Sequence, residues 1–237
     1  MVDTGAVKLE DRLIYRDALM LVLDKPQGIP VHPGPGGGPN LEDGFDALRF
    51  GLPRVPNLAH RLDRDTSGCL ILGRHRKALS RLGKLFQDGR IDKTYLALLP
   101  VVPSEVSGTI DKPLTKVHKW KGWKMRVAES MAEEGAQETV TDYKVLGSAD
   151  GVSLIAFYPR TGRTHQIRVH ALEQFGAAII GDTIYGTDED KQRPRLFLHA
   201  ARLVIPLYPN KDAVTVTAPT PPEFQEFQAV AKWDGTL

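Results

Sequence analysis

The sequence is 237 residues long, which is enough for one large domain or two small ones. Hydrophobic residues make up 41% and charged residues 25% of the chain, which are ordinary globular values and exclude an intrinsically disordered protein. The 31 Lys and Arg against 29 Asp and Glu give a net charge of +2, which as a whole-chain value indicates no strong attraction to nucleic acid or membranes.

The single cysteine excludes an intramolecular disulfide framework and a cysteine-based zinc ribbon. The first residues contain no apolar stretch of the kind found in signal peptides. The longest apolar runs, residues 18–23 and 69–72, are far too short to span a membrane. We therefore expect a soluble, cytoplasmic protein in which Cys69 is buried and inert.

Short apolar runs bounded by turn residues predict strands, and apolar residues at helical spacing predict helices. In chain order, the predicted strands are residues 13–15, 18–23, 69–72, 95–99, 138–145, 152–158 and 214–217. The predicted helices are residues 41–50, 75–88, 164–175 and 221–231. Residues 24–28 and 32–40 predict a turn and a loop, and residues 104–135 are weakly patterned.

Strands outnumber helices, and few connections follow a regular β-α-β pattern, so we predict an α+β fold with a largely antiparallel sheet. The sequence has no visible internal repeat and no linker rich enough in Pro, Gly or Ser to separate two domains. We expect one domain over residues 1–237, with its core at about residues 13–219.

The charge is unevenly distributed. Residues 54–93 contain ten Lys or Arg and four Asp or Glu, and residues 112–126 contain six Lys or Arg and no acid, so each block carries +6. Such local fields bind phosphate backbones even when the total charge is near zero. Taken alone, each block is more typical of a solvated surface. In the second block Trp120 and Trp123 lie among lysines, which suits stacking on bases or packing on the core.

The segment HRLDRDTSG at residues 60–68 has catalytic potential, because it precedes a predicted buried strand and has no periodicity of its own. Loops held by a rigid sheet are where catalytic groups usually lie. Asp63 lies among cations and is expected to stay ionised, as a nucleophile or base must at neutral pH. The alternative is a capped turn, since Asp65, Thr66 and Ser67 are common turn residues.

Two further segments carry polar groups. In RTGRTHQIRVH at residues 160–170, three arginines precede or enter a predicted helix, and Arg168 lies near its buried edge. A partly buried guanidinium needs an anionic partner, and Asp63 is the candidate. In the other segment, Lys93-Thr94-Tyr95, the tyrosine opens a strand, a position that is usually core or interface.

Several other chemistries are excluded. The chain has no G-x-S-x-G elbow and no H-E-x-x-H metal motif. The glycines at 36–38 are not followed by Lys-Ser or Lys-Thr, so they do not form a phosphate-binding P-loop. His165 and His170 are five residues apart and do not share a helical face.

Together these segments resemble the RluA family of pseudouridine synthases, whose hallmark is His-Arg-Leu-Asp-x-x-Thr-Ser-Gly. Residues 60–68 match it without departure, and later family segments match at residues 93–95 (Lys-x-Tyr) and 161–168 (Thr-Gly-Arg-x-His-Gln-Ile-Arg). Weaker matches, in family order, are Asp24-Lys25-Pro26 with Gly28, Gly181-Asp182 with Tyr185-Gly186, and Leu198-His199-Ala200.

The resemblance implies a pseudouridine-synthase-like fold: a mixed, mainly antiparallel, bent sheet with flanking helices and a central RNA-binding cleft. It implies isomerisation of a specific uridine in structured RNA, ribosomal or transfer RNA, to pseudouridine. The target base flips out, an aspartate is needed to break the glycosidic bond, and a bond to carbon 5 forms. The family uses no metal or organic cofactor, and we expect a monomer.

Carried over by motif position, Asp63 is the catalytic aspartate, and Arg168 is the arginine that holds it. Tyr95 is the tyrosine that stacks on the target base and is placed to assist proton removal at carbon 5. Arg61 resembles the arginine that helps to occupy the space left by the flipped base. The other expected RNA-binding or loop-shaping residues are His60, Thr66, Lys93, Lys119, Lys121 and Arg163.

Many family members carry a small basic RNA-binding domain before the catalytic one. The first predicted strand begins near residue 13, so we expect that domain to be absent here. RNA selection would then fall to the catalytic domain, in particular to residues 112–126.

The route taken by Asp63 stays open, and two alternative functions remain. Asp63 could add to the sugar, add to the ring or abstract a sugar proton. A non-enzymatic RNA-binding protein on the same scaffold is one alternative function. A nucleoside hydrolase that uses Asp63 and releases free uracil is another, although the basic blocks favour polymeric RNA over a free nucleoside.

Overall fold

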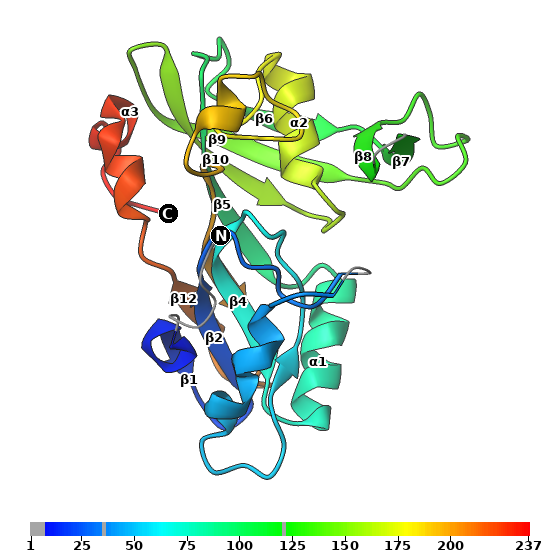
Figure 1. The fold of residues 1–237 in the computed structure, drawn as a ribbon, viewed down its shortest axis with the longest axis vertical. Coiled ribbons are helices and arrows are strands. Elements are labelled where there is room, and N and C mark those ends of the chain that lie inside the picture. Colours follow the sequence, from blue (N-terminus) through cyan, green and yellow to red (C-terminus); the bar gives the residue numbers. More distant parts are fainter. Residues whose placement is uncertain (1–7, 35–36, 120–121) are drawn as a thin grey trace. The chain divides into compact units, whose positions relative to one another are not determined.

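The computed structural model describes residues 8–34, 37–119 and 122–237 (Figure 1). The chain divides into two compact units. Unit 1 contains residues 1–92 and 200–219, and unit 2 contains residues 93–199 and 220–237. Each unit is therefore built from segments that are far apart in the sequence. This division does not test the expectation of a single domain, which stays a prediction.

Unit 1 contains a sheet in the order β1-β2-β4-β11, with β3 pairing with β4 and β12 with β11. The strands are β1 (Leu13–Arg16), β2 (Met20–Lys25), β3 (Asn57–Leu58), β4 (Ser67–Gly73), β11 (Leu198–Ile205), which enters from unit 2, and β12 (Val214–Thr217). The central pair is antiparallel, with Met20 opposite Gly73 and Lys25 opposite Gly68. All seven residues of β4 are buried, so the sheet is covered on both faces at this strand.

Helix α1 (Arg76–Gln87) covers this sheet next to β4 (Figure 1). It begins after His75, whose Nδ1 accepts a hydrogen bond from the N–H of Ala78. Its apolar side brings Leu82 and Leu85 into a core with residues of β2, β4 and β11. Two 3-10 helices, Leu9–Arg12 and Leu41–Arg49, complete the unit.

Unit 2 contains a second run of antiparallel strands in the order β5-β10-β9-β6. They are β5 (Asp92–Leu99), β6 (Ser107–Asp111), β9 (Val140–Ala149) and β10 (Val152–Pro159). Tyr95 of β5 lies opposite Phe157 of β10, which is fully buried. Helix α3 (Gln228–Ala231) lies on β9 and β10, after the 3-10 helix Pro222–Glu226.

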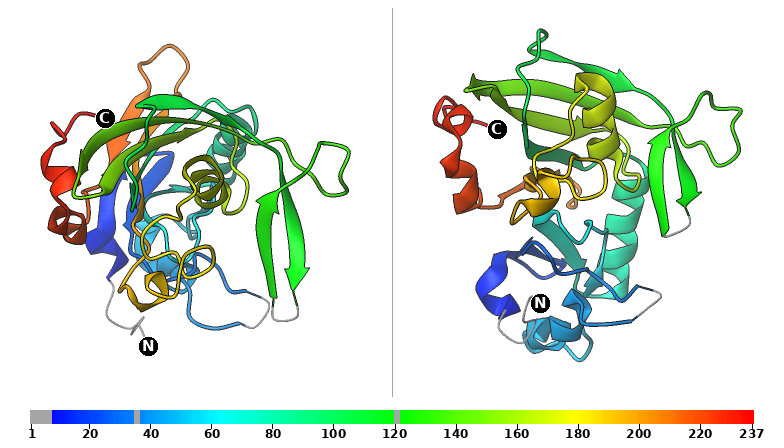
Figure 2. Two further views of the ribbon diagram at one scale, coloured as in Figure 1. Left: turned by 90° about the horizontal axis from the view of Figure 1, so that it is seen from above. Right: turned by 45° about the horizontal axis from the view of Figure 1, so that its top comes forward.

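A separate hairpin in unit 2 is formed by β7 (Leu114–Lys119) and β8 (Gly122–Val127) (Figure 2). Its base packs on helix α2 (Gln166–Phe175), where Leu114, Met125 and Val169 form a small apolar cluster. A further 3-10 helix, Asp190–Gln192, lies in the loop between α2 and β11.

The predicted fold class is confirmed: the protein is α+β with a mainly antiparallel sheet and few helices. The last predicted strand, residues 214–217, coincides with β12. Cys69 is fully buried in β4 as expected, and burial raises the pKa of its thiol to about 12. Within the described ranges, no helix combines the length and apolarity that membrane crossing requires.

Some elements differ from the predictions. The helix expected at residues 41–50 is a 3-10 helix, with the poor helix former Gly44 inside it. The closing helix expected over residues 221–231 is divided at Phe227, which has an extended backbone. Residues 104–135 contain three strands where only weak patterning was visible, and β3 and β11 were not predicted.

Candidate functional site

The predicted site residues fall into two groups, one in each unit. Unit 1 holds His60, Arg61, Asp63 and Thr66, and unit 2 holds Lys93, Tyr95, Arg163 and Arg168. The Lys119 side chain and all of Lys121 lie outside the described residues.

Asp63 opens a tight turn that leads directly into β4. The N–H of Thr66 donates to the carbonyl of Asp63 at 3.2 Å, and Arg64 and Asp65 occupy the two central positions. The Arg64 guanidinium binds the Asp65 carboxylate through two hydrogen bonds of 3.0 and 3.1 Å. Thr66 is buried, whereas Asp63 is half-buried. The turn thus has the capped geometry that turn residues favour, and it holds Asp63 at the end of a rigid strand.

The buried side chain of Lys25 binds the backbone of this turn. It is fully buried, and its Nζ donates to the carbonyls of Pro26, Ile29 and Arg64 at 2.7, 2.8 and 2.9 Å. These three acceptors satisfy all three donors of an ammonium group. Desolvation lowers the pKa of Lys25 to about 7, although the carboxylates of Asp65 and Asp63 act in the opposite direction. The Arg64 carbonyl, next to Asp63, is therefore fixed by a buried amine.

Gly68 permits a close approach beneath the same turn. Its φ is +105°, and a Cβ atom there would lie 2.3 Å from the carbonyl oxygen of Ala200 in β11. Only glycine fits such a conformation at such a distance. The last residue of the HRLDRDTSG motif is thus required by the packing of β4 against β11.

His60 and Arg61 precede Asp63 in different surroundings. The Nε2 of His60 accepts a hydrogen bond from the N–H of Ile71 at 3.0 Å, and its ring lies 4.5 Å from that of Phe86 in α1. His60 therefore ties the motif to β4 and α1, which supports a loop-shaping role. Arg61 is exposed. Contact of either residue with RNA stays a prediction.

Arg168 is held by a buried carboxylate in unit 2. Its Nε and Nη2 donate to Asp182 at 2.7 and 2.6 Å, and the side chains are 3% and 0% exposed. Asp182 also accepts from the N–H groups of Ile184 and Tyr185 at 2.9 and 3.0 Å. The Tyr185 ring lies 5.2 Å from the guanidinium carbon of Arg168. The arginine is therefore fixed on one edge and one face.

Asp182 is a partner of Arg168 that the sequence motifs did not predict. It was visible only as a weak family match, and its contact with Arg168 joins residues 14 positions apart across a loop. The predicted pairing of Arg168 with Asp63 joins residues of different units and stays a prediction.

The loop before α2 is held by Gln166. The buried side chain of Gln166 accepts from Thr161 Oγ1 and from the N–H of Arg163, at 2.8 and 3.0 Å, and donates to β9. Lys93 adds a bond of 3.1 Å to the Thr161 carbonyl. Arg163 itself is exposed, and Tyr95 is half-buried on β5. The loop therefore has a fixed backbone that presents an exposed arginine.

His170, in the same motif, has a structural position. It is fully buried on α2, and its two ring nitrogens lie 2.9 and 3.0 Å from the hydroxyls of Thr141 and Thr139. Burial lowers the pKa of His170, so the neutral ring is favoured.

Acidic partners neutralise part of the positive charge of residues 112–126. Lys112 forms an ion pair with Glu173 at 2.7 Å, and Arg126 binds Glu133 through two bonds, the longer 3.1 Å. Both pairs are exposed and weak in stability terms. The hairpin therefore presents less net positive charge than its sequence indicates, with Lys116 and His118 exposed on it.

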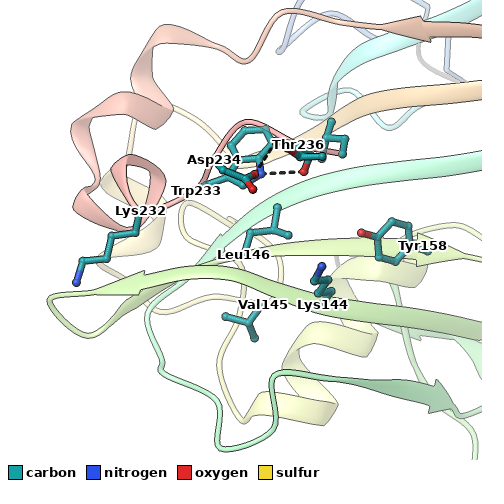
Figure 3. Close-up of a pocket in the computed structure, with 9 residues that line it drawn as sticks. Lys144, Val145, Leu146, Tyr158, Lys232, Trp233, Asp234 and Thr236 are labelled. Carbon is teal, nitrogen blue, oxygen red and sulfur yellow. Dashed lines mark hydrogen bonds between the residues drawn. The ribbon is translucent and has the colours of Figure 1, made fainter.

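A pocket of about 320 Å³ lies in unit 2 between β9, β10 and the C-terminal segment (Figure 3). Lys144, Tyr158 and Trp233 are among its lining residues, and the Trp233 indole donates to the carbonyl of Thr236 at 3.0 Å. The lining contains none of the predicted site residues. Across the described ranges, no cluster of three or more His, Cys, Asp or Glu side chains is arranged to hold a metal ion.

Comparisons with known proteins agree on one family. The family model for RNA pseudouridylate synthase matches residues 19–173, which is more than half of the chain. An uncharacterized RNA pseudouridine synthase of Zymomonas mobilis is 41% identical over 92% of this chain and 97% of its own length. The ribosomal large subunit pseudouridine synthase C of Buchnera aphidicola is 31% identical over 94% of this chain and 71% of its own.

A solved structure gives the same result. Human RNA pseudouridylate synthase domain containing 4 superimposes with a TM-score of 0.77 and 25% identity, covering 94% of this chain and 93% of the human chain. The sequence resemblance therefore extends to the fold.

Proposed function

We propose that this chain, which belongs to the RluA family of RNA pseudouridine synthases, modifies ribosomal RNA through Asp63. Enzymes of this family isomerise uridine to pseudouridine in RNA. The main support for the role of Asp63 is the intact HRLDRDTSG motif. The turn of this motif is held by the buried Lys25. The Buchnera relative, named for the large ribosomal subunit, supports ribosomal over transfer RNA.

In the proposed reaction, the target uridine leaves its stack, because the bond from sugar to base cannot be broken and re-formed inside a duplex. The bond from C1′ to N1 breaks, the base rotates, and C1′ bonds to carbon 5. Carbon 5 loses its proton and N1 gains one, so the product is an isomer and no co-reactant is needed. Asp63 assists by adding to the sugar, adding to the ring or removing a sugar proton.

The other proposed roles follow from position. Tyr95 stacks on the target base and assists the loss of the carbon 5 proton. Arg168, oriented by Asp182, stabilises the charge of Asp63, which must be ionised to act. Arg61 helps to occupy the space left by the flipped base, and Lys93, Lys119, Lys121, Arg163, His60 and Thr66 contact RNA or shape the loops that do. We propose a cytoplasmic monomer without a cofactor.

The test is a map of pseudouridines in ribosomal and transfer RNA from cells with and without the gene. We expect one or more sites in large-subunit ribosomal RNA to disappear, and to return when the gene is restored. Loss confined to transfer RNA would overturn the ribosomal assignment. An unchanged map in both RNA classes would contradict the proposed substrate altogether.

A further inference from the structure

Trp123 of the β7–β8 hairpin stays partly exposed, although its strand packs against α2. Along one face of the hairpin, Leu114 and Met125 are buried in the cluster against α2. Trp123, next on the same face, is 42% exposed and lies opposite His118. A large aromatic ring that stays partly exposed beside a buried cluster is a feature of binding surfaces.

The indole is fixed from one side. The His165 ring stacks on it at a centroid distance of 5.3 Å and an angle of 25°. His165 itself has φ of 55°, a left-handed conformation that costs energy for a residue other than glycine. Its Nδ1 lies 2.8 Å from the Tyr185 hydroxyl, and that hydroxyl accepts from the N–H of Met125 at 3.0 Å. Trp123 is therefore pre-oriented by groups next to Arg168.

The surroundings of the ring include an exposed cation, which would attract a negatively charged partner. The Lys116 amine lies 4.7 Å from the Trp123 ring centroid, and Lys116 and His118 are exposed on the same face. An exposed ammonium gains less on an indole than a nucleobase does. An arriving base would displace the amine, which would then lie close to the phosphate of the same nucleotide.

We propose that Trp123 is a stacking platform for an unpaired base of the RNA substrate, with Lys116 as its phosphate partner. The proposal rests on the proposed function and adds a determinant of RNA binding outside the family motifs. Through His165 and Tyr185, the platform is connected to the residues that hold Arg168, so a base stacked there would be placed at a fixed position relative to the catalytic arginine.

The first test compares Trp123→Leu with Trp123→Phe, using a large-subunit ribosomal RNA transcript tritiated at carbon 5 of uridine. We expect Trp123→Leu to raise KM roughly tenfold with kcat nearly unchanged, since stacking on an aromatic ring contributes about that factor. Trp123→Phe keeps an aromatic ring and should recover most of the loss. Equal KM values for the Leu variant and the wild type would overturn the proposal. Wild-type turnover reports separately on the proposed function.

The second test does not depend on turnover. The chain has three tryptophans, so a Trp120→Phe/Trp233→Phe variant reports Trp123 alone by fluorescence. Single-stranded oligouridylate should quench this emission, and an RNA duplex of equal length should quench it far less. No quenching by the single strand, as expected if the surface binds a protein or nothing, would overturn the proposal. Equal quenching by the duplex would contradict it as well.

Discussion

The substitution Lys25→Met tests whether the buried amine holds the turn that carries Asp63. Methionine has a similar volume but no donor, so the carbonyls of Pro26 and Ile29 lose the donor that the structure gives them. The Arg64 carbonyl keeps its bond of 2.9 Å from the N–H of Gly28. Two orphaned carbonyls cost ~2–6 kcal/mol together. At pH 8 the pKa of about 7 leaves the amine mostly neutral, so its burial cost offsets little of this loss. The two N–H donors of the neutral amine still suffice for Pro26 and Ile29, because the Arg64 carbonyl has the Gly28 donor.

We therefore expect Lys25→Met to lower the free energy of unfolding by about 3 kcal/mol at pH 8, measured by urea denaturation followed by circular dichroism. The rate of pseudouridine formation should fall as well, because the turn that carries Asp63 is less well fixed. Lys77→Met is the matched control, since Lys77 is exposed on α1. A Lys25→Met variant with the stability and kcat of the wild type would refute the reasoning.

Three more predictions concern the pH dependence of stability, the Arg168–Asp182 ion pair and two glycines. The pKa of Lys25 is about 7 in the folded protein against an ordinary 10.5, so the unfolded chain binds more protons between these values. The contribution of Lys25 to the free energy of unfolding should therefore rise with pH across this window, by up to about 1.4 kcal/mol per pH unit. Urea midpoints of the wild type and of Lys25→Met at pH 6, 7.5 and 9 will show whether this slope depends on Lys25. Asp182→Asn leaves Arg168 buried without its carboxylate and should cost ~3–5 kcal/mol and most of the activity, whereas Asp188→Asn, in an exposed pair with Lys191, should leave thermal melts unchanged. Gly68→Ala should cost at least ~3 kcal/mol because of its clash with Ala200, while Gly83→Ala, in open space on α1, should stabilise by about 0.5–1 kcal/mol; a reversed order in denaturation midpoints would contradict the packing argument.

The parts of the fold that the sequence predicted best are those where burial alone decides the structure. Residues 69–72 lie within the fully buried β4, and the apolar spacing of residues 75–88 became α1 with His75 as its cap. The hairpin of β7 and β8 was missed because its polar residues lie on both faces, and among its described side chains only Leu114, Met125 and the polar Thr115 are buried. Strand β11 was missed because Arg202 interrupts its apolar pattern.

In the candidate site, the sequence predicted residues within local motifs but not the residues that orient them. Motifs pointed to Asp63 and Arg168, whose proposed roles rest on residue types at short, fixed spacing. The groups that orient them were not identified, because Lys25 and Asp182 act through contacts with residues 39 and 14 positions away. The net charge of +2 conceals basic blocks, and the structure adds that Lys112 and Arg126 of the second block already have acidic partners.

The central claim is that Asp63 is the catalytic group of a uridine-isomerising enzyme, and release of tritium from carbon 5 of uridine in ribosomal RNA tests it most directly. The matched pair is Asp63→Asn and Asp65→Asn, two isosteric changes in one turn. We predict that Asp65→Asn releases tritium at a rate close to that of the wild type, and that Asp63→Asn folds normally, binds the RNA and releases none. Sustained release by a folded Asp63→Asn protein would contradict the account.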